Sequence, residues 1–105
     1  MAKKNPFRVT ENEVAFAIVQ VCKTAPNGVA SFSRCKREVP NHLNLSAGDR
    51  KISVTRPNEE LWEQLIRNIK SHFDVPGNYL HDGYLKHIPR VGYEVTQAGR
   101  GKRIP

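Results

Sequence analysis

EELWEQLIRNIKSHF (Glu59–Phe73) and GYLKHIPRVGYEVTQAG (Gly83–Gly99) are the two segments that decide how this chain folds. Placing successive residues of the first segment about 100° apart gathers its apolar side chains in one arc, as in a helix with one buried face. These side chains are Leu61, Trp62, Leu65, Ile66, Ile69 and Phe73. The second segment indicates two short strands around a basic turn. A helix followed by a small basic hairpin is therefore predicted.

The ends of this helix follow from its cap and breaker residues. Thr55 or Asn58 is expected to cap the start, since Arg56-Pro57 suits a first turn. DVPGN (Asp74–Asn78) brings proline and glycine and is expected to end the helix. The next two residues, Tyr79–Leu80, favour a short strand.

The hairpin is predicted from alternation around a turn. Tyr84–Ile88 is the first strand, Pro89–Gly92 the tip and Tyr93–Thr96 the return strand. Thr96 is also a candidate N-cap for a last helical turn, with Gly99 expected to terminate it. Tyr93 is the tyrosine that best links the hairpin to the core.

A first helix begins cleanly near the N-terminus. Thr10 and Glu13 form a capping-box pattern, and an apolar run of about 13 residues follows. Ala25–Gly28 (APNG) is a turn signal that should end this helix. Cys22 lies on its apolar side, and we expect Cys22 and Cys35 to be free thiols in a reducing compartment.

A second helix is predicted after a very short strand at Val29–Ala30. Ser31 is its candidate N-cap, and the helix covers Phe32–Val39 before Pro40. Ser46–Asp49 resembles a capping box and is expected to open one helical turn. Arg50–Arg56 is basic and rich in β-branched residues, which favours an exposed loop or an edge strand.

Length and charge limit the functional classes. A chain of 105 residues is expected to hold one modest core, and 17 Lys+Arg against 10 Asp+Glu give a formal charge of +7. This excess favours a polyanion, most commonly nucleic acid, although many basic surfaces are only solvated. No apolar run approaches the roughly 20 residues of a membrane span, and no signal peptide is visible. We therefore expect a cytoplasmic protein without a membrane partner.

Together these elements resemble a known family. The order helix, helix, helix, hairpin is that of the winged helix, an α+β fold with a helix-turn-helix core and a C-terminal hairpin wing. LNLSAGDR (Leu43–Arg50), LWEQLIRNIKSH (Leu61–His72) and GYEVTQAGR (Gly92–Arg100) resemble the N-terminal domain of Mrr-type restriction endonucleases. The similarity implies a DNA-reading module whose third helix enters the major groove and whose wing touches the backbone or minor groove.

The chain differs from these enzymes in stopping at Pro105, so we expect no nuclease domain and no cleavage. The expected organisation is a flexible basic N-terminus at 1–9, a winged-helix domain at 10–100 and a basic tail at 101–105. The function expected is non-catalytic duplex DNA binding, as a small transcriptional regulator or a specificity component related to restriction systems. Acting as a homodimer or within a larger assembly is compatible with this.

The candidate DNA contacts fall on the third helix, on the wing and on the basic segments beside them. Gln64, Arg67 and Asn68 offer amide and guanidinium groups for base edges, and Ser71 could reach a phosphate. By position in the resemblance, Arg67, Asn68, Ser71 and His72 lie on the reading helix and Lys86, His87 and Arg90 on the wing. Candidate phosphate anchors are Arg34, Lys36, Arg37, Arg50, Lys51, Arg56, Lys86, Arg90 and the tail.

Charge distribution complicates this assignment. Residues 57–74 carry four acids against two bases, a net of −2, whereas residues 34–56 carry six bases against two acids and residues 84–105 five against one. Acids early in a helix stabilise it through the dipole, but they repel phosphates. The acidic first turn therefore favours an alternative, a protein-interaction adaptor or inhibitor on a winged-helix scaffold.

Catalysis and metal binding have little support in the sequence. The four histidines and two cysteines lack zinc-ligand spacing, and no nucleophile accompanies a base, so we expect no enzyme activity, no cofactor and no metal. Trp62 could stack on a base, but its position in the apolar arc favours the core.

Overall fold

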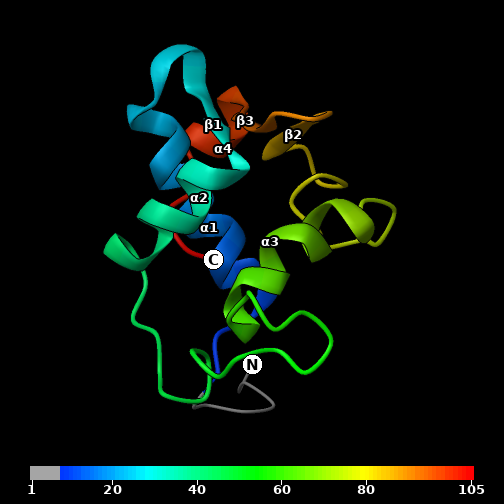
Figure 1. The fold of residues 1–105 in the computed structure, drawn as a ribbon. Coiled ribbons are helices and arrows are strands. Elements are labelled where there is room, and N and C mark those ends of the chain that lie inside the picture. Colours follow the sequence, from blue (N-terminus) through cyan, green and yellow to red (C-terminus); the bar gives the residue numbers. More distant parts are fainter. Residues whose placement is uncertain (1–7) are drawn as a thin grey trace.

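Four α-helices and a three-stranded antiparallel sheet form an α+β fold over residues 8–105, the part of the chain that this computed structural model describes (Figure 1). Residues 1–7, most of the expected flexible N-terminus, lie outside the described residues. The elements in chain order are α1 (Glu11–Thr24), η1 (Pro26–Gly28), β1 (Val29–Ser31), α2 (Phe32–Glu38), η2 (Val39–Asn41), α3 (Leu61–Ser71), β2 (Leu85–Ile88), β3 (Gly92–Val95) and α4 (Gln97–Arg100).

The predicted N-caps of α1, α2 and α4 are confirmed. Thr10 accepts a hydrogen bond from the Glu13 N–H at 3.1 Å, and the Glu13 carboxylate accepts from the Thr10 N–H at 2.8 Å. Ser31 and Thr96 cap α2 and α4 in the same manner, each accepting from an N–H three residues later. Each cap satisfies backbone donors that a helix start leaves without partners.

α3 is shorter than predicted at both ends. Its N-cap is Glu60 rather than Thr55 or Asn58, because the preceding loop folds back and the Lys51 carbonyl accepts from the Leu61 N–H at 2.8 Å. The helix ends at Ser71, so Phe73 leaves the apolar arc and is 61% exposed. The apolar spacing in the sequence extends to Phe73, but the backbone already leaves the helix in a turn at 72–75.

The sheet has the order β1-β3-β2. β2 begins one residue later than the predicted first hairpin strand and ends at Ile88 as predicted, whereas β3 lies one residue earlier than the predicted return strand. Tyr79 and Leu80 form a turn rather than the expected strand, since the Tyr79 carbonyl accepts from the N–H groups of Tyr84 and Leu85. Gly99 does not terminate α4. It lies buried within α4, where a Cβ would clash with the Tyr84 carbonyl, and Gly101 is the C-cap.

The core lies between α1, α3 and the sheet, with α1 behind α2 and α3 and the sheet above α3 in Figure 1. Tyr93 is fully buried and its hydroxyl donates to the Ile66 carbonyl at 2.5 Å, so it links β3 to α3 as predicted. Trp62 is 3% exposed, which confirms its place in the core. Cys22 and Cys35 are buried free thiols, and burial raises their pKa values to about 11 and about 12.

Within residues 8–105, no helix has the length and apolar character that crossing a bilayer requires.

Candidate nucleic-acid interface

A polar groove of about 380 Å³ runs along the outward side of α3, and we call it the α3 groove. Its lining residues are Thr55, Arg56, Gln64, Arg67, Asn68, Lys70 and Ser71. The positions 64, 67, 68 and 71 share one helix face, because residues three and four apart are neighbours on a helix. The lining has cations, amides and hydroxyls and no carboxylate, so it can contact phosphates and base edges.

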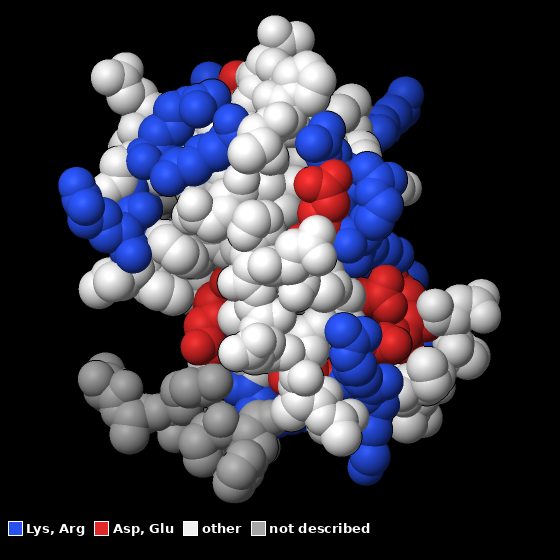
Figure 2. Space-filling view, turned by 90° about the vertical axis from the view of Figure 1, so that its left-hand side faces the viewer, with Lys and Arg blue, Asp and Glu red and all other residues white. Residues whose placement is uncertain are grey.

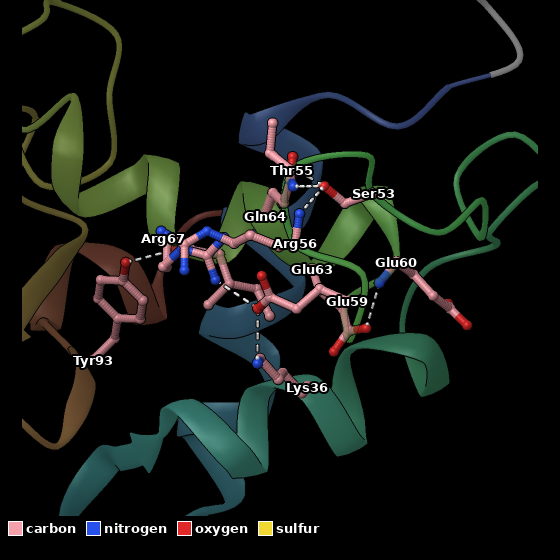
Figure 3. A network of polar contacts seen from close by, with 11 residues as sticks. Lys36, Ser53, Thr55, Arg56, Glu59, Glu60, Glu63, Gln64, Arg67 and Tyr93 are labelled. Carbon is pink, nitrogen blue, oxygen red and sulfur yellow. Dashed lines mark hydrogen bonds and ion pairs between the residues drawn. The ribbon is translucent and has the colours of Figure 1, made fainter.

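The second wall of the α3 groove is a loop that is held by one buried serine (Figure 3). Ser53 is 3% exposed, and its Oγ accepts from the Arg56 N–H at 3.1 Å. The same oxygen accepts from the Gln64 side-chain amide and lies 3.2 Å from the Thr55 hydroxyl. Ser53 therefore fixes Thr55 and Arg56 beside α3. Gln64, predicted to contact bases, also holds this loop.

Two residues predicted to contact DNA, Arg67 and Lys36, both form ion pairs with the Glu59 carboxylate beneath the groove. Glu59 Oε2 lies 2.5 Å from a guanidinium nitrogen of Arg67 and 3.0 Å from Lys36 Nζ (Figure 3). The Glu59 side chain is 11% exposed. The hydrogen bond from Arg67, with that from Lys36, outweighs burial and lowers the pKa of Glu59 to about 2. Glu59 is thus ionised and offsets part of the charge of both cations.

The remaining acids at the start of α3 have structural partners. Glu60 Oε1 accepts from Trp62 Nε1 at 2.8 Å and from Arg50 at 3.2 Å. Glu63 completes a capping box by accepting from the Glu60 N–H at 2.9 Å. The acidic first turn is therefore accounted for by contacts within the chain. Arg50, a predicted phosphate anchor, lies in one of these ion pairs.

The other predicted anchors are spread over the surface. Arg34 and Arg37 of α2 both contact Glu38, at 2.7 and 3.2 Å, and Lys51 is exposed on the loop before α3. Figure 2 shows Lys and Arg side chains in separate groups on either side of a largely uncharged band, with Asp and Glu side chains on both sides of that band. The cations do not form one continuous surface on this face.

The wing residues divide between two places. Arg90 is exposed at the hairpin tip with a φ of 66°, while Lys86 and His87 line a different groove beside β2. The His87 ring lies 6.1 Å from the Phe32 ring, and burial, together with the nearby Lys70 ammonium, lowers its pKa.

His72 lies apart from the α3 groove. Its Nδ1 is 2.8 Å from a Glu11 carboxylate oxygen, so this side chain faces the start of α1. In the described part of the chain, no three His, Cys, Asp or Glu side chains are grouped as metal ligands.

Lys70 and Thr55 line the α3 groove but were not among the predicted contacts. Lys70 lies on the polar side of the helical projection, which could have identified it. Thr55 carried no such signal, because its position depends on the fold of the loop around Ser53. Comparison with protein-family models, with curated proteins and with solved structures found no match to this chain.

Proposed function

We propose that this chain is a winged-helix domain that binds duplex DNA without catalysis, with α3 in the major groove. The α3 groove is the observation that carries this proposal. It combines two amides, two hydroxyls and three cations from α3 and the loop beside it, and no acidic side chain lines it. Amides and guanidinium groups can form paired hydrogen bonds with base edges, and ammonium groups contact phosphates.

The order of elements supports the winged-helix assignment. The hairpin of β2 and β3 follows α3, and β1, which precedes α2, pairs with β3 to complete the sheet. In such a domain the hairpin is the wing that accompanies the reading helix. The proposal keeps the resemblance to the N-terminal domain of Mrr-type enzymes, and with it a role as a small regulator or as the specificity part of an assembly.

Arg90 supports a contact from the wing. It occupies position i+2 of the Ile88–Val91 turn, which is closed by a hydrogen bond from the Val91 N–H to the Ile88 carbonyl at 3.0 Å. A positive φ at that position normally favours glycine or asparagine. An arginine there costs conformational energy, and a phosphate or minor-groove contact gives a reason for it.

The charges set the expected strength of salt dependence. Arg56 and Lys70 of the α3 groove and Arg90 at the wing tip have no ion pair among the described residues, whereas Arg67 shares Glu59 with Lys36. Three phosphate contacts give a slope of log K against log salt of about −2.7, or about a 40-fold loss of affinity between 50 and 200 mM salt.

Fluorescence anisotropy with a labelled random-sequence duplex at about 50 and 200 mM salt tests the proposal. Arg56→Ala should weaken binding and reduce the slope by about 0.9. Lys23→Ala is the matched control, because it removes the same charge from the exposed end of α1, away from the groove. Asn68→Ala should reduce discrimination between sequences more than the salt slope. Absence of binding at low salt, or equal losses for Arg56→Ala and Lys23→Ala, would refute it.

The alternative function, a protein-interaction adaptor or inhibitor, has less support once the contacts of the acidic residues at the start of α3 are known. It was favoured by the acidic first turn of α3 as a surface for a partner, but Glu59, Glu60 and Glu63 each hold a contact within the chain. We therefore do not propose a partner surface at the start of α3.

A further inference from the structure

A second groove, of about 500 Å³, lies between the end of α3 and β2, and we call it the β2 groove. Its lining is mainly apolar with a basic part, and consists of Lys70, Phe73, Leu80, Leu85, Lys86, His87 and Ile88. Phe73 is 61% exposed, so its side chain is open to a ligand. The volume lies within the range of ligand-binding clefts.

β2 presents part of an open strand edge along this groove, because the outward N–H of Leu85 already donates to the Tyr79 carbonyl at 3.2 Å. Among residues 8–105, β2 pairs only with β3, in the sheet order β1-β3-β2. The Thr96 N–H donates to the Tyr84 carbonyl at 3.3 Å, so alternation along the antiparallel ladder directs the backbone of Lys86 and Ile88 toward β3. The N–H and C=O of His87 consequently point away from β3. Such an edge is able to pair with another extended segment.

The walls of the β2 groove are held in place by a buried asparagine. Asn78 is 4% exposed, and its Nδ2 donates to the Ile69 carbonyl of α3 at 2.9 Å. Its Oδ1 accepts from the N–H groups of Leu80 and His81 at 2.7 and 3.2 Å. The segment that carries Leu80 is therefore tied to α3, and the groove is formed before any ligand arrives.

We propose that the β2 groove binds a short extended peptide of alternating acidic and apolar residues, added as a strand to β2. The apolar side chains lie against Phe73 and Leu80, the acidic ones meet Lys70 and Lys86, and the peptide backbone bonds to His87. Strand addition of this kind takes affinity from main-chain hydrogen bonds and specificity from alternate side chains. This site does not rest on the DNA proposal, but it shares Lys70 with the α3 groove.

Charge identifies the occupant as acidic. A second copy paired antiparallel through β2 would bring the Lys86 ammonium groups of the two copies together, which disfavours self-association. The chain's own tail, 100–105, carries Arg100, Lys102 and Arg103 and meets the same repulsion. A duplex presents phosphates, but it offers no extended apolar side chains to fill the groove.

Binding of a fluorescein-labelled seven-residue peptide, in which aspartate alternates with valine, phenylalanine and isoleucine, tests this proposal. The peptide should bind at concentrations below about 1 mM. A matched peptide with lysine in place of aspartate should bind at least about tenfold more weakly, because it meets Lys70 and Lys86 as like charges. A peptide N-methylated at its central residues should lose binding to the same degree, because it cannot bond to the strand edge.

Two measurements on the protein locate the site. Lys86→Glu should weaken peptide binding by at least about tenfold, whereas Lys23→Glu, the same charge change on α1, should not. Hydrogen exchange of the His87 amide should slow in the complex. Three results would overturn the proposal: no peptide binding, equal binding of the N-methylated peptide, or dimerisation of the free chain through β2. Displacement of the peptide by duplex DNA, with His87 protected equally by DNA, would assign the groove to DNA instead.

Discussion

Glu59→Gln should destabilise the fold by an amount that depends on pH. The substitution keeps the shape of the side chain but removes the charge that Arg67 and Lys36 face at 2.5 and 3.0 Å. Glutamine can still accept a hydrogen bond from one of them. Arg67 and Lys36 then remain side by side beneath the α3 groove without the anion between them. Leaving such charges uncompensated lowers the free energy of unfolding more than the loss of one hydrogen bond does.

The pKa of Glu59 gives the magnitude and the sign. The pKa of Glu59 falls from 4.5 to about 2 on folding. At about 1.4 kcal/mol per pKa unit, the ionised carboxylate contributes about 3 kcal/mol to the free energy of unfolding at neutral pH. Because the folded pKa is depressed, this contribution is present above pH 4.5 and is lost as pH falls toward 2. At pH 3 about 1.4 kcal/mol of it should remain.

Urea unfolding followed by the fluorescence of Trp62 measures this directly, because Trp62 is the one tryptophan of the chain and is buried. Urea is preferable to guanidinium chloride, since a salt would screen the ion pair. Glu38→Gln is the matched control. Glu38 also contacts two arginines but is more exposed, and its loss should cost less than about 1 kcal/mol. An equal cost for both variants, or a Glu59→Gln cost that is the same at pH 7 and pH 3, would refute the reasoning.

Three further substitutions test the backbone and the loop. Arg90→Gly should leave the free energy of unfolding unchanged or raise it by up to about 1 kcal/mol, because glycine adopts a positive φ without strain, while anisotropy should show weaker duplex binding. Gly99→Ala should cost about 1–3 kcal/mol in urea unfolding because its Cβ clashes with the Tyr84 carbonyl; Gly101→Ala, with room for a Cβ, should cost little. Ser53→Ala should cost about 1–3 kcal/mol, since it leaves two donors without their acceptor, and circular dichroism should show α3 intact.

Features that depend on neighbouring residues could be predicted from the sequence. The caps at Thr10, Ser31 and Thr96 each need an N–H only three residues away, so their patterns are local. The apolar arc of α3 likewise follows from spacing alone, and Trp62 is buried as its place in the arc predicts. β2 begins one residue later than predicted and β3 lies one residue earlier, because turn signals indicate where a hairpin tip lies but do not fix which residues of the two strands pair.

Features that depend on residues far apart in the sequence could not be predicted from the sequence. Glu59 accepts a hydrogen bond from Lys36, which lies 23 positions earlier in the chain, and no pattern in the segment around Glu59 predicts that contact. α3 begins at Leu61 because the loop before it folds back and the Lys51 carbonyl accepts from the Leu61 N–H. The local cap patterns at Thr55 and Asn58 do not predict this contact. Phe73 is exposed because the chain turns out of the helix before it. In each case a tertiary contact outweighed a local preference.

The position of Glu59 bears on how such a domain would choose its DNA. In a chain with a formal charge of +7, the Glu59 carboxylate lies between Arg67 of α3 and Lys36 of α2. That arrangement fixes the Arg67 guanidinium in one orientation but reduces the attraction of this surface for phosphates. Because phosphate contacts add affinity for every sequence alike, fewer of them leave a larger share of the binding energy to base contacts at Asn68 and Arg67. Glu59 would then favour discrimination over affinity, and Glu59→Gln should bind random duplex more tightly, with a steeper salt dependence, while distinguishing sequences less.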